Sequence, residues 1–252
     1  MPTPAARIKN LRKIFHTRNG ETLAIEDFSL HINEGEFIVL VGPSGCGKTT
    51  VLSILAGLVQ PSSGEIIYCD DHVRMGYMLQ DDHLFPWRTI LDNIYLGLEI
   101  QGRDTIENKE RAESLLTTYG LSKFKNHYPN QLSGGMRQRA ALIRTLAVNP
   151  EILLLDEPFS ALDYQTRMAV TDDIGSIIKR EAKTAVMVTH DITEAISLAD
   201  RVVIMTQRPG KIKKIHDIIL TGTDGTPSQN RKAPEFMNYY NDIWKELDIH
   251  VQ

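Results

Sequence analysis

The stretch FIVLVGPSGCGKTT, residues 37–50, places an apolar run directly before a glycine-rich loop. The five apolar residues have the length of a buried strand, and the sequence after the loop, TTVLSILAGL, has the apolar spacing of a helix. The spacing G-x-x-x-x-G-K-S/T is matched by Gly42, Gly47, Lys48 and Thr49. A strand, a glycine loop and a helix in this order form a cradle for phosphates, because glycines let main-chain N–H groups turn toward an anion at the helix N-terminus.

This loop is expected to hold a nucleotide through main-chain N–H groups and two side chains. We expect the Lys48 amine to reach the β- and γ-phosphates and the Thr49 hydroxyl to bind Mg²⁺. Because Cys46 lies inside the loop, we also expect its alkylation to inhibit the protein and a bound nucleotide to protect it. The alternative is a chance glycine-rich turn. The predicted nucleotide-binding residues are Gly42, Pro43, Ser44, Gly45, Cys46, Gly47, Lys48, Thr49 and Thr50.

Two further apolar runs end in side chains that suit phosphate chemistry. In EILLLDEP, residues 151–158, the run is followed by Asp156, expected beside Mg²⁺, and by Glu157, expected to activate an attacking water. In AVMVTHD, residues 185–191, the run is followed by His190. Ligands of open parallel sheets bind at the carboxyl ends of the strands, so His190 is expected near the γ-phosphate. Ordinary surface acids and a surface histidine are the alternatives.

The composition restricts the class of protein. The chain has 252 residues, 42% of them hydrophobic, with a net charge of -4 and a pI near 6.1. That charge argues against a nucleic-acid partner. Two cysteines, Cys46 and Cys69, make no disulfide framework in a chain of this length and indicate a reducing, cytosolic setting. The sequence has no signal-peptide pattern and no apolar run of membrane length, so a membrane role is expected to need a partner.

A short uncharged segment, LSGGM at residues 132–136, completes a recognisable series. A phosphate loop, Gln80, LSGGM, LLLDEPFSALD and VTHD follow one another in the order that resembles the ATP-binding-cassette (ABC) ATPases. The resemblance extends from Phe15 to about Gly210. The main departure is Met136, where the family pattern has glutamine, so no polar contact is expected from this side chain. We expect Arg137 and Arg139 to be structural or surface residues.

The resemblance implies an α/β fold, with a P-loop NTPase (RecA-like) core, a small antiparallel β subdomain and an inserted helical subdomain. One ABC ATPase domain is expected over 1–252, with its core at 1–86 and 148–215. The helical subdomain with LSGGM is expected at 87–147, and a tail with a helix at 216–252. A short Gly64–Gln80 segment predicts a trimmed hairpin. The tail helix is expected to pack on its own core or, alternatively, to face a partner through Phe236, Tyr239, Tyr240, Ile243, Trp244 and Leu247.

In this family each ATP lies between two chains packed head to tail. The resemblance implies that the signature segment Leu132, Ser133, Gly134, Gly135 and Met136 faces the γ-phosphate of ATP held by the partner. It also implies that Ser160, Ala161, Leu162 and Asp163 form a loop that touches the opposite site. Phe15 is expected to stack on adenine, with a core aromatic as the alternative. Gln80 is expected to contact Mg²⁺ and the attacking water. The expected catalytic residues are thus Glu157, His190 and Gln80, and the expected metal ligands are Thr49, Gln80 and Asp156.

A finer similarity concerns transport. The segments LFPWRTILDNIYLGLEIQG, LSGGMRQR and SLADRVVIMTQRPGKI are similar to the ATPases of nitrate, sulfonate and taurine importers. This implies an ATPase dimer of identical chains or close paralogues at the cytoplasmic face of the membrane, bound to permease subunits and, indirectly, to a solute-binding protein. The permease is expected to be gripped by Leu84, Phe85, Pro86 and Trp87. The alternative is a soluble ABC-type ATPase that acts as a mechanical switch on a non-membrane partner.

Overall fold

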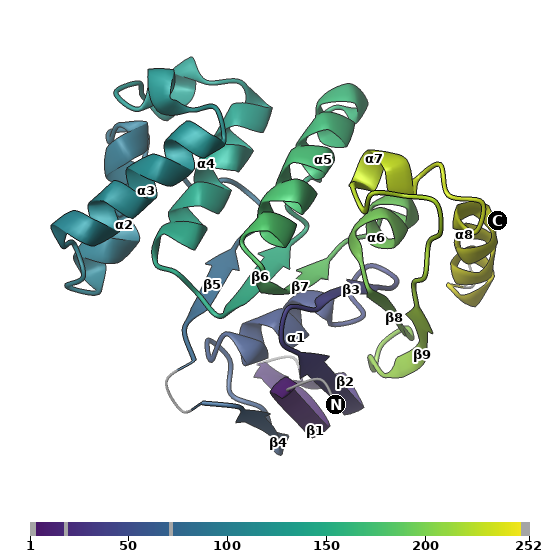
Figure 1. Cartoon of the computed structure of the whole chain (residues 1–252). Helices are drawn as coiled ribbons and strands as arrows, with labels where there is room; N and C mark the ends of the chain where they lie inside the picture. Colours follow the sequence, from purple (N-terminus) through teal and green to yellow (C-terminus); the bar gives the residue numbers. More distant parts are fainter. Residues whose placement is uncertain (1–3, 18–19, 71–72, 248–252) are drawn as a thin grey trace.

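A computed structural model describes residues 4–17, 20–70 and 73–247. Two sheets form its frame (Figure 1): a six-stranded sheet in the order β5-β6-β7-β3-β8-β9 and a three-stranded sheet in the order β2-β1-β4. Strand β9 pairs antiparallel with β8, and the other neighbours in the larger sheet are parallel. The larger sheet contains β3 (Phe37–Val41), β5 (Met75–Met78), β6 (Ile152–Asp156), β7 (Thr184–Val188), β8 (Arg201–Met205) and β9 (Ile212–Asp217). The smaller sheet contains β1 (Pro4–Thr17), β2 (Gly20–Asn33) and β4 (Ser63–Tyr68).

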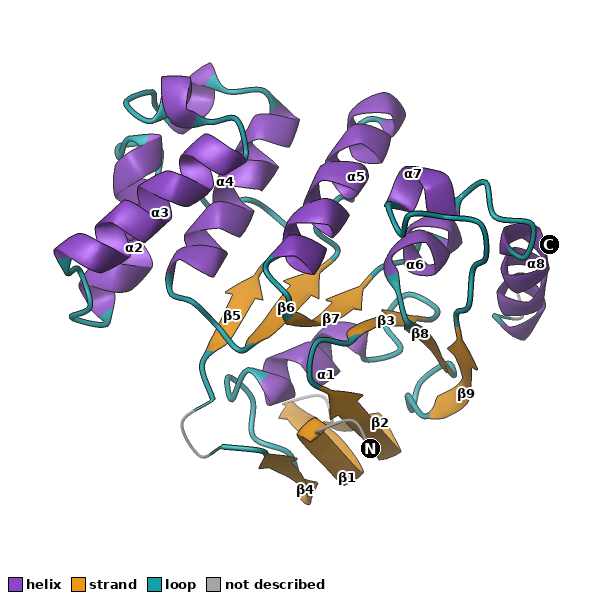
Figure 2. Cartoon of the chain, viewed as in Figure 1, coloured by secondary structure: helices purple, strands orange, loops and turns teal. Residues whose placement is uncertain are grey.

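Helices cover both faces of the larger sheet (Figure 2). On one face lies α1 together with the antiparallel sheet, and on the other face lie α4, α5 and α6. The helices are α1 (Lys48–Leu55), α2 (Ile90–Ile100), α3 (Ile106–Thr118), α4 (Gly134–Ala147), α5 (Tyr164–Arg180), α6 (Ile192–Leu198), α7 (Pro227–Asn230) and α8 (Phe236–Glu246), with short 3-10 turns at Ser122–Phe124 and Pro129–Gln131. This is the P-loop NTPase fold, with the antiparallel and helical additions that the sequence predicts.

The larger sheet is buried on both faces because its strands are apolar at consecutive positions. In β3 all five residues are buried, and they alternate between two cores. Phe37, Val39 and Val41 pack into the core formed with α2–α6, whereas Ile38 and Leu40 pack into the core formed with α1 and the antiparallel sheet. Continuous apolar runs are typical of parallel strands with helices on both sides.

The antiparallel sheet departs from one prediction. Strand β4 pairs with β1, whereas β5 joins the parallel sheet next to β6. The segment from Gly64 to Gln80 therefore crosses between two sheets, and the trimmed hairpin predicted there is wrong. Strand period alone does not show which sheet a strand joins, because the pairing partner lies far away in the sequence.

The helices between residues 90 and 147 begin at well-formed caps. Thr89 and Asp92 form a capping box at the start of α2, and Thr105 caps α3. Ser133 caps α4, with its Oγ accepting a hydrogen bond of 3.3 Å from the Met136 N–H. Such caps satisfy N–H groups that have no partner within the helix.

The tail packs on the body of the protein, which confirms the first of the two predictions for it. Phe236 and Ile243 on α8 are buried in the core that includes α6. Trp244, predicted on the same apolar stripe, keeps 39% of its surface exposed and stacks on Tyr240 with ring centroids 6.1 Å apart. Residues 248–252 of the predicted tail lie outside the described part of the chain.

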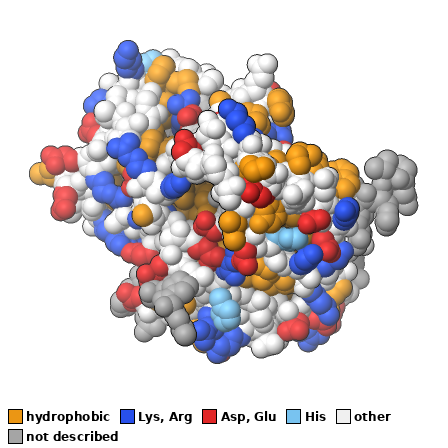
Figure 3. Space-filling view, turned by 45° about the vertical axis from the view of Figure 1, so that its right-hand side comes forward, with side chains coloured by type: hydrophobic (Ala, Val, Ile, Leu, Met, Phe, Trp, Pro, Cys, Tyr) orange, Lys and Arg blue, Asp and Glu red, His pale blue; other side chains and the backbone are white. Residues whose placement is uncertain are grey.

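The surface mixes charges of both signs. On the side shown in Figure 3, Lys and Arg side chains lie among Asp and Glu, with hydrophobic side chains between them. None of the helices in the described ranges is long and apolar enough to cross a membrane.

Candidate functional site

The glycine loop and α1 meet at the carboxyl end of β3, as the sequence predicts. Gly45 and Gly47 have φ angles of 72° and 109°, in the left-handed region that favours glycine. At Gly47 a Cβ would also lie 2.5 Å from Ile25 Cδ1 of strand β2. The loop therefore needs glycine for its turn and for its close approach to the antiparallel sheet.

Lys48 is the cation at the centre of this loop. Lys48 is only 6% exposed, and its Nζ donates hydrogen bonds to the carbonyls of Gly42 (2.7 Å) and Pro43 (3.0 Å). These bonds fold the side chain back along the loop. A buried amine held by carbonyls is positioned to contact an anion at the start of α1.

The Asp156 carboxylate accepts hydrogen bonds from two hydroxyls, those of Thr49 and Tyr77. The Thr49 hydroxyl donates to Asp156 Oδ1 (3.0 Å), and the Tyr77 hydroxyl donates to Asp156 Oδ2 (3.2 Å). Burial raises the pKa of Asp156, while both hydrogen bonds act in the opposite direction. Burial likewise raises the pKa of Tyr77 to about 12, so its hydroxyl stays a donor. A hydroxyl beside a buried carboxylate fits the oxygen ligands that Mg²⁺ uses in phosphate sites.

Glu157 directly follows Asp156 and has a backbone conformation that residues other than glycine rarely adopt. Its φ of 44° lies in the left-handed region, and its N–H donates to the Val188 carbonyl across the sheet (2.9 Å). Its Oε2 lies 3.1 Å from His190 Nδ1. A non-glycine residue in this region costs about 1–3 kcal/mol and is often found where function demands the conformation. The backbone strain and the histidine contact together aim the carboxylate.

The segment around His190 is tied to α6. Asp191 caps this helix, with Oδ1 accepting from the N–H groups of Thr193 (2.7 Å) and Glu194 (3.2 Å). The hydroxyl of Thr189 donates to Glu194 Oε2 (2.5 Å) and accepts from the Asp191 N–H. Burial raises the pKa of Glu194 to about 7. Both neighbours of His190 are thus fixed, while the imidazole itself is exposed.

One cavity of about 470 Å³ is bordered by Lys48, Thr49, Glu157 and His190. Phe15 of β1 and Thr22 of β2, which are cross-strand partners, form the wall on the side of the antiparallel sheet. Phe15 keeps 37% of its surface exposed, so it is not the core aromatic of the alternative interpretation. The lining consists of Phe15, Thr22, Ala24, Ser44, Gly45, Gly47, Lys48, Thr49, Thr50, Glu157, His190 and Arg208.

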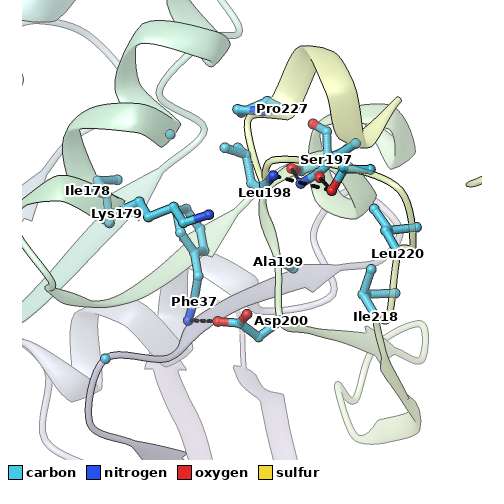
Figure 4. A pocket seen from close by; sticks show the side chains of 15 residues that line it. Phe37, Ile178, Lys179, Ser197, Leu198, Ala199, Asp200, Ile218, Leu220 and Pro227 are labelled. Atoms are coloured by element: carbon cyan, nitrogen blue, oxygen red, sulfur yellow. Dashed lines mark hydrogen bonds between the residues drawn. The ribbon is translucent and has the colours of Figure 1, made fainter. Parts of the chain in front are cut away.

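A second cavity, of about 310 Å³, lies at the opposite end of β3 (Figure 4). Its polar groups are already bonded within the chain: Asp200 Oδ2 accepts from the Phe37 N–H (2.8 Å), and Asn230 donates to the Ser197 carbonyl (2.8 Å). Lys179 is directed to the Asp224 carbonyl (3.4 Å). The cavity at the phosphate loop combines a cation, a strained carboxylate and a histidine, so we take it as the candidate active site.

Comparison with known proteins identifies the family. The family described as "ABC transporter" matches residues 25–160. The uncharacterized ABC transporter ATP-binding protein YtlC of Bacillus subtilis is 47% identical over 90% of each chain. The nitrate import ATP-binding protein NrtD of Synechocystis sp. is 39% identical over 94% of this chain and 92% of its own.

The chain belongs to the ABC transporter family of ATP-binding proteins. It is an ABC-type ATPase, as the order of its motifs predicts.

Other relatives agree with this assignment. The taurine import ATP-binding protein TauB of Pelagibacter ubique is 37% identical over 93% of this chain and 92% of its own. Among solved structures, the post-hydrolysis dimer of the ATP-binding cassette MJ0796, bound to ADP and Pi, superposes with a TM-score of 0.72. Its identity is 33%, and the match covers 85% of this chain and 99% of that one.

In this ABC ATPase the signature segment is only partly accessible. Ser133 is exposed, whereas Leu132 and Gly135 are buried. A Cβ on Gly135 would lie 2.8 Å from Val170 Cγ2 on α5, so this glycine is needed for packing within its own chain. Met136 packs against the core. Ser133 is therefore the exposed residue at this helix start, next to the half-buried Gly134, and none of the five signature residues, all of them described, lines the cavity.

The loop predicted to touch the opposite site lies between β6 and α5. Asp163 caps α5 by accepting from the Thr166 N–H (3.1 Å), and Leu162 is buried. Ala161 at the tip is exposed, and Ser160 donates to the Glu157 carbonyl (3.1 Å). Gln80 donates to Ser160 Oγ (3.3 Å) and does not line the cavity. The structure thus brings Gln80 to this loop instead of to Thr49 and Asp156, where its predicted metal role would place it.

The predicted permease-coupling loop divides into a buried and an exposed part. Leu84 is 7% exposed and belongs to the core, so it anchors the loop and is not part of its surface; the prediction for this residue is revised accordingly. Trp87 is 70% exposed and stacks on Phe85 with centroids 4.9 Å apart. Pro86 between them is also exposed. The accessible apolar surface consists of residues 85–87.

Two arginines of the signature helix hold this loop. Arg137 Nε donates to Asp82 Oδ2 (2.9 Å), and its Nη1 donates to the Leu132 carbonyl (2.9 Å). Two turns later, Arg144 donates to the main-chain carbonyls of Asp82 (2.8 Å) and His83 (2.7 Å). The structural role expected for Arg137 is therefore correct. The roles of Asp82 and Arg144 were missed, because their partners lie 55 and about 60 residues away.

Four residues of the candidate site were also missed by sequence reasoning, and three of them, Thr22, Ala24 and Arg208, line the cavity. Tyr77 has no motif around it and is identified only by its bond to Asp156. The positions of Thr22 and Ala24 at the cavity can be inferred from that of Phe15 only when the β1–β2 register is known. Arg208 lies in the segment QRPG. The proline and glycine of this segment predict a turn, but they do not show that the turn packs against the phosphate loop.

The cysteine prediction requires correction. Cys46 is 1% exposed and its side chain packs in the core below the loop, so an adduct on it is hindered by burial and not by phosphates. Cys69 is exposed.

We now expect brief alkylation of the native protein to label Cys69 and to leave ATPase activity within about twofold of the untreated value, since a reactive thiol must be accessible. Peptide mass spectrometry with and without ATP measures the labelling of both cysteines, and a Cys69→Ser variant serves as the control. Rapid labelling of Cys46 with loss of activity would contradict this expectation.

Proposed function

We propose that this ABC ATPase is the energising subunit of a solute importer of the nitrate, sulfonate and taurine type. Relatives named as nitrate and taurine import ATP-binding proteins match more than nine tenths of the chain. In this proposal two copies pack head to tail at the cytoplasmic face of the membrane, against integral permease subunits that receive solute from a binding protein. Neither the site nor these relatives favour the alternative of a switch on a non-membrane partner.

ATP binding in this proposal uses the cavity at the phosphate loop. The Lys48 amine contacts the β- and γ-phosphates, main-chain N–H groups of residues 45–50 surround them, and Phe15 stacks on adenine. Thr49 and Asp156 would hold Mg²⁺, which would neutralise phosphate charge. The contact between the Thr49 hydroxyl and the buried Asp156 carboxylate supports this assignment. Gln80 contacts the loop after β6 through Ser160, so we assign it to the coupling between the ATP site and the permease and not to metal binding.

Hydrolysis in this proposal needs a base and an orienting group. The Glu157 carboxylate accepts a proton from the water that attacks the γ-phosphorus, as ADP leaves. His190 holds that carboxylate through its Nδ1 contact of 3.1 Å and lines the same cavity. The partner chain completes the site with the exposed N-terminus of α4, where Ser133 and the N–H groups after it stabilise negative charge. The dimeric cassette MJ0796 supports this arrangement.

The observation that carries the coupling part of the proposal is the loop from Gln80 to Trp87. At one end Gln80 bonds to Ser160, which in turn bonds to the main chain of Glu157. At the other end Phe85 and Trp87 form a stacked aromatic pair at the surface. Arg137 and Arg144 join the middle of this loop to the signature helix. A movement at either half of an ATP site is thereby transmitted to one exposed apolar patch.

We expect Trp87→Ala to lower the recovery of permease about 10- to 30-fold, the effect of losing an aromatic anchor at a protein interface. ATP hydrolysis by the isolated subunit should stay within about twofold, since Trp87 is largely exposed and does not line the cavity. The measurement is affinity purification of the tagged chain from solubilised membranes of its host, with importer permeases quantified by mass spectrometry.

The matched control is Trp244→Ala, because the chain has two tryptophans and Trp244 lies on α8. Equal permease recovery with both variants, each verified by thermal melting, would reject the coupling role of the loop. Recovery of no permease by the wild-type chain would reject the importer assignment itself.

A further inference from the structure

The loop between β8 and β9 packs against the phosphate loop, although the two loops are far apart in the sequence. Gly210 donates its N–H to the Ala24 carbonyl (2.9 Å) and accepts from the Glu26 N–H (3.1 Å). A Cβ on Gly210 would lie 2.1 Å from the Cys46 carbonyl oxygen, so only glycine fits. The loop is therefore fixed to strand β2 on one side and to the phosphate loop on the other.

The conformation of this loop is also secured from within. Thr206 donates its main-chain N–H to the Lys211 carbonyl (3.0 Å), and its hydroxyl accepts from the Lys211 N–H (3.0 Å). The same hydroxyl lies 2.9 Å from the Gln207 carbonyl and 3.0 Å from the Pro209 carbonyl. Such a network leaves little freedom at Arg208, which projects from the middle of the loop.

Arg208 uses this position to reach the tip of the phosphate loop. Its Nε and Nη2 donate to the Gly45 carbonyl at 3.1 and 2.9 Å, across 163 residues of sequence. A guanidinium has five N–H groups, so these two bonds leave three that are not used there. The side chain is exposed and lines the cavity together with Lys48 and Phe15.

The charge of Arg208 is not neutralised by a neighbour. Among the described residues no carboxylate forms an ion pair with it, whereas Lys211, three residues later, pairs with Glu26 at 2.9 Å. An unpaired guanidinium at the rim of an anion site attracts phosphate and forms strong, directional hydrogen bonds with it. The hydrogen bonds to the Gly45 carbonyl hold the guanidinium beside the phosphate loop, so no carboxylate is needed to position it.

We infer that Arg208 is a nucleotide-binding residue that contacts the phosphate chain of the bound nucleotide with its remaining N–H groups. It acts as a second cation, attached to the Gly45 carbonyl, whereas the Lys48 amine is attached to the carbonyls of Gly42 and Pro43. The inference rests on the proposed ATP site and adds to it a residue from the β8–β9 loop. Because the contact is with phosphate, it discriminates nucleotides from nucleosides and not adenine from guanine.

The test compares Arg208→Gln with Arg208→Lys and with Lys211→Gln, using the intact chain. Glutamine retains an N–H donor for the Gly45 carbonyl but removes the charge, and lysine retains the charge. Lys211→Gln removes an equal charge from the same loop. Affinities for ATP, ADP, GTP and adenosine are measured by calorimetry at about 0.05 M and about 0.5 M salt, where screening differs strongly.

We expect Arg208→Gln to weaken ATP and ADP binding about 3- to 10-fold at low salt, with a smaller ratio at high salt, and to weaken GTP binding by the same factor as ATP binding. Adenosine binding should be unchanged. Arg208→Lys should lose less ATP affinity than Arg208→Gln, because lysine keeps the charge but not the planar set of donors, and Lys211→Gln should stay within about twofold of the wild type.

Three outcomes would overturn the inference. Wild-type affinity in Arg208→Gln means that there is no phosphate contact. An equal loss for adenosine and ATP, or a loss that salt does not reduce, means that the residue only shapes the site. A change in the ratio of ATP to GTP affinity means that it contacts the base. If the wild-type chain itself binds no ATP, or if Lys48→Ala binds it unchanged, the proposed ATP site fails, and the inference fails with it.

Discussion

Lys48→Ala should abolish measurable ATP binding. The amine is the cation buried within the phosphate loop, and its hydrogen bonds to Gly42 and Pro43 hold it where the phosphates are expected. Each charge-assisted hydrogen bond is worth about 1.5–3 kcal/mol, or about 10- to 150-fold in affinity. An amine that contacts two phosphates therefore contributes more than one such factor.

Calorimetric titration with ATP measures this loss, and thermal melting verifies that the variant is folded. The control is Lys9→Ala, which removes the same side chain from an exposed ion pair with Glu65 on the antiparallel sheet. Surface pairs of this kind contribute about 0–1 kcal/mol, so the control should bind ATP normally. ATP affinity within a few-fold of wild type in a folded Lys48→Ala protein would remove the phosphate-loop assignment.

Glu157→Gln should bind ATP normally and hydrolyse it about 10²–10⁴-fold more slowly, because an amide does not accept the proton of the attacking water. The substitution preserves the shape of the side chain and leaves an oxygen or a nitrogen for the 3.1 Å contact with His190. Bound ATP then persists, and we expect the variant to accumulate as a dimer that depends on ATP.

Phosphate release measures the rate, and size exclusion with and without ATP measures the dimer. Glu151→Gln, at the opposite end of β6, is the matched control, since Glu151 is bonded to Arg74 on the surface. Hydrolysis at the wild-type rate would exclude Glu157 as the base. A variant that binds ATP but stays monomeric at every concentration would count against the composite site formed with the partner's signature segment.

The parts of the site that could be predicted are those encoded in short, continuous stretches of sequence. The phosphate loop follows from its glycines, whose positive φ angles at Gly45 and Gly47 are a local requirement. Asp156, Glu157 and His190 follow from apolar runs that end where a parallel strand ends, since the carboxyl ends of such strands share one edge. The family and the P-loop NTPase fold follow from the order of these motifs, and both are confirmed.

Contacts between distant segments were not predictable from the same stretches. The burial of Leu84 and of the Cys46 thiol depends on which helices and sheets pack over them. The need for glycine at position 135 comes from Val170 on another helix, although the signature segment suggested a partner chain. The bond of Gln80 to Ser160 spans 80 residues, so local sequence does not show that Gln80 lies at the loop after β6.

The chemistry of this protein can be predicted from short stretches of its sequence, because phosphate binding and proton transfer need particular residues at particular local spacings. Which side chains face the cavity, the core or the solvent depends on tertiary packing. Arg208 illustrates the difference: its turn is readable from QRPG, but its place beside Gly45 exists only because Gly210 packs on the Cys46 carbonyl and on β2. Local spacing constrains backbone conformation, whereas proximity across 163 residues arises from the packing of two sheets and the loops between them.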